Sequence, residues 1–575
     1  MIHYFKKILL SLLCISLLLS SSLQLSSVYA VLSSPMNGLH STYTSKKQVN
    51  VTIDPRTEFI SILQMMIGAW PMSELDFDYM YEIQGTFFQH YGHPAIEMFS
   101  VMWYNYGFSQ EIPSTFMLHL SNPPELKIMT PFTKEIIDKA GGERNLNDFL
   151  VLLRDFAKLT DFMGFYHQHQ LFYQDCIEQV EKKLGSKNTI PMLEDYFGFS
   201  DRSHSLILVP LFSEIGYGTH VDKNYYALIG PYDVEEKKGD RNPYWAGPDD
   251  LHKQLLKSFS YAYVNPMIYD HKTEILATSK LFKPISTQMR YQKILDWQSC
   301  LTEHIVRGVS QYFTYQEYGT EAFDTQREQD IYSFFVYIDY TREWLKIYEN
   351  HRFFYTDFNQ FYPVIFNHVR LLCECPLIPT MVSIENVSEN GVQITWKDNT
   401  SEPGALQVFR RTKNSSYEVI HQTNDRNISI WTDTNVTIGE TYWYQIGIQG
   451  IGGTIRSYAV RATIPAYPPL APENVQVEKE DQKLHFRFSY QYKAHGFTLF
   501  EWVDGKRKPL QSISYDDMVP DSDCLYQITI EEYDSTKDHI YFVCAYVTIP
   551  DKPSKEKTLY SSPSNFINIT GIDSE

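Results

Sequence analysis

The hydrophobic pattern of this chain of 575 residues changes once, near residue 376, and the change separates two kinds of fold. Before it, apolar residues recur at helical spacing in long segments, which indicates amphipathic helices. After it, apolar and polar residues alternate in short runs between turn residues, which indicates half-buried strands. The chain is too long for one hydrophobic core. We therefore predict a multidomain protein, with a mainly helical α+β domain followed by two all-β sandwiches.

The N-terminus has the pattern of a signal peptide. Lys6 and Lys7 precede an apolar run, and Val28-Tyr29-Ala30 resembles a cleavage site. We interpret residues 1–30 as the signal peptide and the Ser/Thr-rich residues 31–50 as a flexible tether. No later run is long and apolar enough to span a bilayer. We expect a secreted, extracellular protein, free or surface-associated, with no transmembrane segment after signal removal.

The net charge limits the kinds of binding partner that we expect, and the cysteines suggest one disulfide. The formal net charge is −19 and no basic stripe is present, which argues against a nucleic-acid partner. Cys524 and Cys544 lie in two strand-like segments of one C-terminal domain, and export permits disulfides. They are a candidate disulfide, although sequence alone does not assign connectivity.

The region after residue 376 resembles fibronectin type III domains. Residues 392–396 read as a strand ending in an inward Trp396, and Tyr442 is placed like the tyrosine that closes the corner of such a sandwich. We assign residues 377–464 to this domain and residues 473–571, where the Trp has no equivalent, to a second one. The proline-rich residues 465–472 are predicted to be a stiff linker.

Two local predictions concern the helical domain. A helix is expected from Asp249 to Val264, because Pro266 disfavours helical geometry at Asn265. Two apolar runs are expected to be short buried strands, with Gly216-Tyr217-Gly218 as a turn between them: residues 205–212 and 225–229.

Residues 51–374 resemble an uncharacterised bacterial family, catalogued as domain of unknown function 4932. The resemblance is carried by several stretches in order, among them Val51-Thr52-Ile53-Asp54-Pro55-Arg56-Thr57-Glu58, Tyr263-Val264-Asn265-Pro266 and Glu303-His304-Ile305-Val306-Arg307. It implies a fold similar to zinc metallopeptidases, whose H-E-x-x-H helix supplies two zinc ligands and a general base. It also implies a third ligand from a later helix, at the position that Glu303 occupies here.

This chain departs from that pattern at the three positions that carry the chemistry. They are Lys257, Ser258 and Tyr261. Zinc needs imidazole, thiolate or carboxylate ligands, and a charged lysine has no lone pair to offer. Without the metal there is no activated water. We therefore predict a degenerate former site with no catalytic residue, no metal and no cofactor.

A hypothesis follows for Glu303, the one expected zinc-ligand position that still carries a carboxylate. An unpaired buried carboxylate is costly, so we expect Lys257 to pair with Glu303 in place of the metal; the alternative is that Lys257 lies on a solvated helix face. Further residues are expected near the cleft: Tyr217, His220, Asn265 and His304.

The function predicted is that of an exported, catalytically inactive metallopeptidase-like protein. It binds a peptide, protein or cell-surface ligand through an inherited cleft, and the fibronectin-type domains serve as spacers or binding modules. One alternative is an active zinc metallopeptidase with ligands displaced to residues such as His204, His220 and Glu303. The other is a structural or adhesive cell-surface protein. A deep cleft lined by Tyr217, Tyr261 and Glu303 favours the first interpretation over the last.

Overall fold

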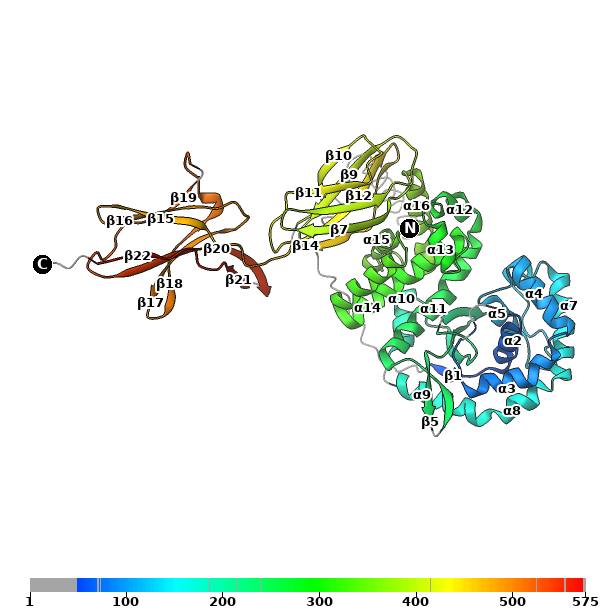
Figure 1. The fold of residues 1–575 in the computed structure, drawn as a ribbon. Coiled ribbons are helices and arrows are strands. Elements are labelled where there is room, and N and C mark those ends of the chain that lie inside the picture. Colours follow the sequence, from blue (N-terminus) through cyan, green and yellow to red (C-terminus); the bar gives the residue numbers. More distant parts are fainter. Residues whose placement is uncertain are drawn as a thin grey trace. The chain divides into compact units, whose positions relative to one another are not determined.

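The computed structural model describes residues 49–69, 72, 74–185, 187–214, 216–237, 239–413, 415–523, 525–552 and 555–571. The signal peptide, nearly all of the tether and Cys524 of the candidate disulfide lie outside these residues. The chain divides into a unit of Pro35–Glu374 and a unit that contains Cys375–Glu575. Helices dominate the first and strands the second, as the blue-to-green and yellow-to-red segments of Figure 1 show. Among the described residues, no helix has the length and apolar character to cross a membrane.

The first unit, here called the helical unit, is built mainly from α-helices joined by short 3-10 or π turns. The first begins at Asp54, whose side chain accepts a hydrogen bond from the Arg56 amide, with Pro55 at its first position. The helices are α2 (Pro55–Met66), α3 (Asp78–Phe87), α4 (Pro94–Val101), α5 (Ile112–Leu118), α6 (Lys134–Lys139), α7 (Glu143–Leu159), α8 (Phe162–Gln168), α9 (Gln170–Leu184), α10 (Thr189–Phe197), α11 (Pro248–Asp270), α12 (Lys272–Ala277), α13 (Ser286–Tyr291), α14 (Trp297–Tyr332), α15 (Ile338–Asn350) and α16 (Phe358–Glu374).

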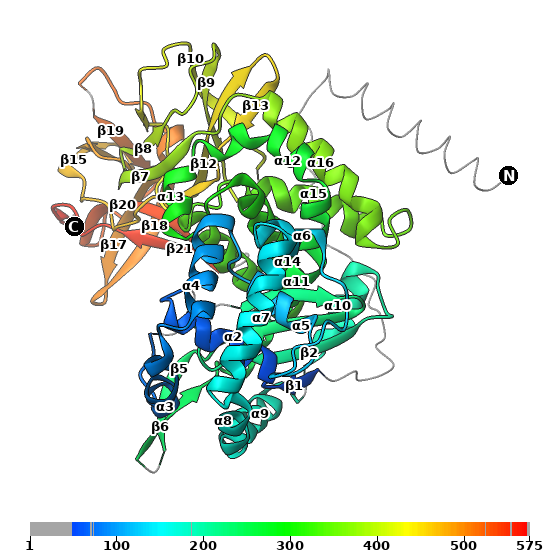
Figure 2. The same cartoon turned by 90° about the vertical axis from the view of Figure 1, so that its right-hand side faces the viewer.

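A mixed sheet runs through this unit in the order β1-β2-β4-β3. Its strands are β1 (Asn50–Thr52), β2 (Ser203–Leu208), β3 (Gly216–Val221) and β4 (Asn224–Ile229), and a separate hairpin joins β5 (Asp233–Lys237) to β6 (Asp240–Tyr244). The strands β1, β2 and β4 are parallel, whereas β3 is antiparallel to β4 and forms the edge. Both β3 and β4 pack on α11. The helix α11 also packs on α14, and both helices are labelled in Figure 2.

The prediction that Gly216-Tyr217-Gly218 is a turn is wrong, because these residues open strand β3. The glycines are needed for a close approach to α11 rather than for a turn. A Cβ at Gly218 would lie 1.8 Å from the Ser258 carbonyl oxygen, and one at Gly216 would lie 2.0 Å from the Ser258 Oγ. The edge strand therefore packs directly against α11, the helix that contains Lys257, Ser258 and Tyr261.

The predicted end of the helix at Val264 is also wrong, since α11 continues to Asp270 with Pro266 inside it. Proline removes one helical hydrogen bond, but the surrounding core offsets that loss. Val264 and Ile268, on either side of the proline, are 0% and 1% exposed. The next long helix, α14, is kinked at Gly319, where φ is 78°.

The second unit holds two β-sheet modules, described separately. The first pairs the sheet β10-β9-β12-β13, with β14 on β12, and the sheet β11-β8-β7. Trp396 is 4% exposed, and the Tyr442 hydroxyl accepts a hydrogen bond from the Thr437 amide at 3.0 Å, the contact expected of a corner tyrosine. Its strands are β7 (Thr380–Ser388), β8 (Gly391–Lys397), β9 (Ala405–Arg411), β10 (Glu418–Thr423), β11 (Ile430–Asp433), β12 (Thr441–Gly450), β13 (Gly453–Arg456) and β14 (Val460–Thr463).

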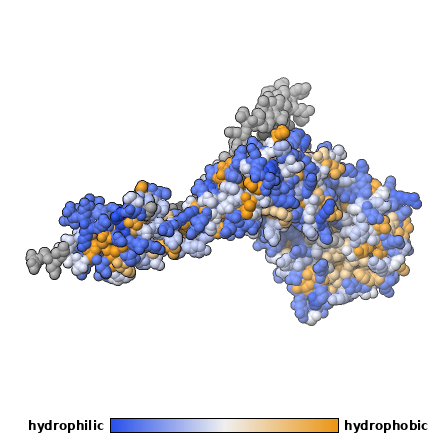
Figure 3. Space-filling view, turned by 45° about the horizontal axis from the view of Figure 1, so that its top comes forward, coloured by the Kyte–Doolittle hydropathy of each residue, from blue (hydrophilic) through white to orange (hydrophobic). Residues whose placement is uncertain are grey.

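The second module contains the sheets β15-β16-β19 and β18-β17-β20-β21, with β22 on β20. Apolar side chains of both sheets, such as Phe486 and Leu499, share one buried core. Its strands are β15 (Glu473–Glu480), β16 (Lys483–Ser489), β17 (Gly496–Val503), β18 (Lys506–Ser514), β19 (Tyr526–Ile530), β20 (His539–Lys552), β21 (Lys555–Tyr560) and β22 (Ile567–Ile569). On the face drawn in Figure 3, hydrophilic residues predominate and apolar residues form scattered patches.

Candidate ligand-binding cleft

A cavity of about 640 Å³ opens in the helical unit between α11, α14 and the edge strand β3. All four positions of the predicted degenerate site lie on its wall: Lys257, Ser258 and Tyr261 from α11, and Glu303 from α14. Tyr217 and Asn265 line it as well, as the sequence analysis expected. We call this cavity the cleft. Residues far apart in the sequence are thus brought to one site by the packing of β3 and α14 on α11.

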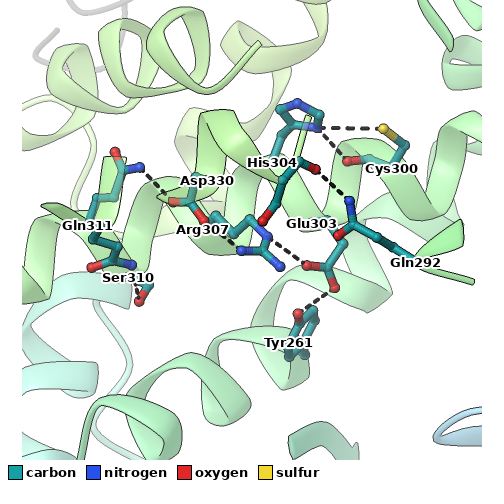
Figure 4. A network of polar contacts seen from close by, with 11 residues as sticks. Tyr261, Gln292, Cys300, Glu303, His304, Arg307, Ser310, Gln311 and Asp330 are labelled. Carbon is teal, nitrogen blue, oxygen red and sulfur yellow. Dashed lines mark hydrogen bonds and ion pairs between the residues drawn. The ribbon is translucent and has the colours of Figure 1, made fainter. Parts of the chain in front are cut away.

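Glu303 is held by two donors. The Tyr261 hydroxyl donates to its Oε1 at 2.5 Å and the Arg307 Nε donates to its Oε2 at 3.1 Å (Figure 4). Burial raises the pKa of the Glu303 carboxyl, but the charges of Lys257 and Arg307 and these two hydrogen bonds outweigh it, so the pKa lies below its usual range. Glu303 is therefore ionised, and each of its oxygens already accepts a hydrogen bond.

Arg307 connects this carboxylate to a second one. Its NH1 donates to the Asp330 Oδ1 at 2.6 Å, and its guanidinium lies 3.8 Å from the centre of the Phe335 ring. Gln311 donates to the other oxygen of Asp330 at 2.8 Å. The sequence analysis did not single out Arg307, although its position four residues after Glu303 on a helix is a signal for an ion pair.

Lys257 does not make the direct contact with Glu303 that we expected. Among the described residues, no hydrogen bond or salt bridge joins the two, and the Lys257 Nζ lies 5.9 Å from the centre of the Tyr261 ring. Burial and the charge of Arg307 lower the pKa of Lys257, while Glu303 and Asp330 act in the opposite direction. The charge of Lys257 therefore acts on Glu303 without a direct contact. The residue that forms the direct ion pair with Glu303 is Arg307.

These side chains do not fit a zinc ion. A charged Lys257 has no lone pair, and the Tyr261 hydroxyl is committed as a donor to Glu303. Burial and the neighbouring Glu303 carboxylate raise the pKa of Tyr261, which disfavours the phenolate that a metal would bind. Within the described ranges, no group of three or more His, Cys, Asp or Glu side chains is placed to hold a metal.

Two more carboxyl groups, those of Glu111 and Glu135, line the cleft. Glu111 accepts a hydrogen bond from the Asn265 amide at 3.2 Å, and burial raises its pKa. Burial and the proximity of Glu111 raise the pKa of Glu135 to about 7, against the opposing charge of Lys139. The cleft thus contains one carboxylate held ionised and two carboxyl groups that retain protons more readily.

Tyr217 presents an unsatisfied hydroxyl to the cleft. The residue is 9% exposed, and its buried hydroxyl has no hydrogen-bond partner among the described residues. Burial raises its pKa, and the charges of Glu111 and Glu303 raise it further, so the hydroxyl stays protonated. Ser258, by contrast, is 1% exposed and is covered by the glycines of β3.

The histidines of the sequence analysis do not converge on the cleft. His304 is fully buried, accepts a hydrogen bond from the Tyr337 amide on Nε2 at 3.3 Å, and points toward Cys300 on the side of α14 away from Glu303 (Figure 4). Burial lowers its pKa to about 4. His220 lines a separate cavity of about 250 Å³, and His204 contacts the Tyr263 hydroxyl at 2.7 Å.

Comparison with known proteins gives a family match for the helical unit. Residues 82–368 match the model of a family described as Domain of unknown function (DUF4932), which confirms the resemblance over this range. The matched range includes α11, α14 and the four positions Lys257, Ser258, Tyr261 and Glu303. A search of curated proteins found no match.

The solved structures that resemble the chain include fibronectin type III proteins. A segment of two such domains from chicken tenascin is 7% identical, with a TM-score of 0.22, and the alignment covers 33% of this chain and 98% of that one. The FN1–FN3 domains of chicken CNTN1 are 14% identical, with a TM-score of 0.17 and coverage of 34% and 68%. A structure titled "Myokine structure" is 17% identical, with a TM-score of 0.15 and coverage of 16% and 100%.

Proposed function

We propose that the helical unit is a metallopeptidase-like domain without zinc chemistry, and that its cleft binds an extended peptide or protein segment without cleaving it. We also propose that the protein is secreted and that the two β-sheet modules, as fibronectin type III domains, space the helical unit from a surface or bind a partner. The observation that carries the proposal is the position of β3, an edge strand that forms part of the cleft wall.

The free edge of β3 supports binding of an extended chain. In the described sheet, β3 pairs with β4 on one side and has no strand on the other. Gly216, Tyr217 and Gly218 of this strand line the cleft. An extended peptide adds to such an edge through main-chain hydrogen bonds, while pockets beside the edge select its side chains. A cavity of about 640 Å³ gives room for several side chains of such a peptide.

The composition of the wall supports binding without hydrolysis. Peptide hydrolysis at a metallopeptidase site needs a metal-activated water and a general base. Lys257, Ser258 and Tyr261 offer neither, and the two oxygens of Glu303 are already bonded to Tyr261 and Arg307. Displacement of the ligands is not favoured either, because His204 bonds Tyr263 while His220 and Glu303 line different cavities.

The test is to incubate the full chain with a library of random decapeptides and to measure both binding and cleavage. We expect micromolar, saturable binding of a subset of peptides, and intact peptides by mass spectrometry with or without added zinc. For one bound peptide, N-methylation at alternate positions should abolish binding, because it removes the hydrogens that pair with a strand edge, while N-methylation at the other positions should be tolerated. Absence of peptide binding, or cleavage that requires zinc, would refute the proposal.

A further inference from the structure

We infer that the cleft contains a carboxylate-binding subsite formed by Lys257 and Tyr217. The inference rests on the proposed peptide-binding function and specifies the chemistry of the ligand: a carboxylate, supplied by the C-terminus of a peptide or by an Asp or Glu side chain. It is carried by two hydrogen-bonding groups of the cleft wall that have no partner among the described residues.

The first unused group is the ammonium of Lys257. The side chain is only partly exposed and lines the cleft. Among the described residues its Nζ makes no hydrogen bond and no salt bridge, and its described contact is with the Tyr261 ring at 5.9 Å. A partly buried cation without a direct partner is costly to keep in a fold, so its presence at a cavity wall points to a partner that arrives from the cavity.

The second unused group is the hydroxyl of Tyr217, on the facing strand β3. It is buried, lines the same cleft and has no hydrogen-bond partner in the described part of the chain. Tyr217 lies between Gly216 and Gly218, the glycines that bring β3 against Ser258, and Ser258 directly follows Lys257 on α11. The strand and the helix that carry the hydroxyl and the ammonium are therefore adjacent on the wall of one cavity.

The acidic groups in the same region are already satisfied. Glu303 accepts from Tyr261 and Arg307, while Asp330 accepts from Arg307 and Gln311. On the cleft wall, the Lys257 ammonium and the Tyr217 hydroxyl lack a hydrogen-bond partner among the described residues, and both can donate. A carboxylate carries two oxygens that can accept from these donors, and hydrogen bonds between a charged acceptor and such donors are the strong ones.

The first experiment uses small probes in calorimetric titrations of the full chain. N-acetylglycine carries the carboxylate, and N-acetylglycinamide is the matched neutral control. We expect N-acetylglycine to bind at least about 10-fold more tightly, the effect of one hydrogen bond to a charged group. Equal binding of both probes, or binding of neither, would overturn the subsite.

The second experiment separates the subsite from the peptide-binding function and identifies the source of the carboxylate. A peptide selected for binding is compared with its C-terminal amide and with an amidated form that carries an internal Glu. Loss of affinity on amidation identifies the C-terminal carboxylate, and recovery with Glu identifies the side chain. If all forms bind equally, peptide binding stands and the subsite fails. If no peptide binds but N-acetylglycine does, the subsite stands and the proposed function fails.

Variants assign the effect to the two residues. Lys257→Met and Tyr217→Phe keep the shape of the side chain, and we expect each to reduce the preference for N-acetylglycine to within about 2-fold. The matched controls are Lys253→Met, one turn earlier on α11, and Tyr226→Phe on β4, neither of which lines the cleft. A preference that survives in Lys257→Met, in a protein whose unfolding temperature is unchanged, would refute the assignment.

Discussion

Glu303→Gln is the substitution that most directly perturbs the charge cluster of the cleft. It keeps the shape of the side chain but removes the negative charge opposite Arg307 and Lys257. Removing one partner of a buried charge pair costs about 3–5 kcal/mol. The side chains of Arg307 and Glu303 remain 22% and 20% exposed. Solvent therefore screens part of the interaction, and we expect a loss of roughly 2–3 kcal/mol in the free energy of unfolding of the helical unit.

The assay is urea unfolding followed by circular dichroism at 222 nm, where the helical unit dominates the signal. The matched control is Glu374→Gln, which removes the partner of Arg370 in a pair with the same i,i+4 spacing, whose side chains are 59% and 53% exposed. That pair is a surface salt bridge, so its loss should change the stability by no more than about 0.5 kcal/mol.

A second substitution tests whether Lys257 belongs to the same cluster. Lys257→Met alone should be nearly neutral, because Glu303 keeps Arg307 and Tyr261 as direct partners. In the Glu303→Gln background the same change should regain about 1 kcal/mol, because it removes a cation that no longer faces a carboxylate. If Glu303→Gln costs no more than Glu374→Gln, or if the effects of the two cleft substitutions simply add, the account of the cluster is refuted.

Four further predictions concern buried groups and close contacts. Burial raises the pKa of Glu58, which accepts a hydrogen bond from Tyr79, from 4.5 to about 7. The contribution of Glu58 to stability is therefore full below pH 4.5 and is lost, by about 3 kcal/mol, as the pH rises through 7. The difference in free energy of unfolding between the wild type and Glu58→Gln should fall by that amount from about pH 4 to 8, and a difference independent of pH would refute the assignment. Burial lowers the pKa of His304 from 6.5 to about 4, so its contribution is full above pH 6.5 and is lost as the pH falls through 4. The difference in free energy of unfolding between the wild type and His304→Asn should therefore shrink as the pH falls from 6.5 to 4, and a difference that does not change with pH would contradict the assignment. Gly218→Ala should destabilise the helical unit by more than about 3 kcal/mol, because its Cβ would lie 1.8 Å from the backbone of α11. Gly85→Ala, an exposed helical position with no atom within 4 Å of the new Cβ, should instead be stabilising by about 0.5–1 kcal/mol in the same assay.

Some features of the chain and of the cleft follow from local patterns in the sequence. The change in hydrophobic period near residue 376 separates helices from strands, because each structure buries one face at its own spacing. The positions Lys257 and Tyr261 are four residues apart and so lie on one face of a helix. Their common wall with Glu303 was expected from the order of the family motifs and agrees with the cavity.

Other features depended on tertiary contacts that periodicity does not encode. Two glycines around Tyr217 suggested a turn, but they are required by the close approach of β3 to α11. Pro266 suggested a helix end, but the buried residues on both sides of it keep α11 continuous. His304 is adjacent to Glu303 in the motif, yet neighbouring residues on a helix point in different directions, so one faces the core and the other the cleft.

The central claim is that a cation–carboxylate cluster replaces the metal of a peptidase-like site. The most direct test is a calorimetric zinc titration of the full chain after treatment with a chelator, with the wild type and Glu303→Gln compared side by side. The account predicts that the two proteins give the same titration, with no zinc bound at the cleft. One tightly bound zinc ion per chain that is lost in Glu303→Gln would contradict the claim.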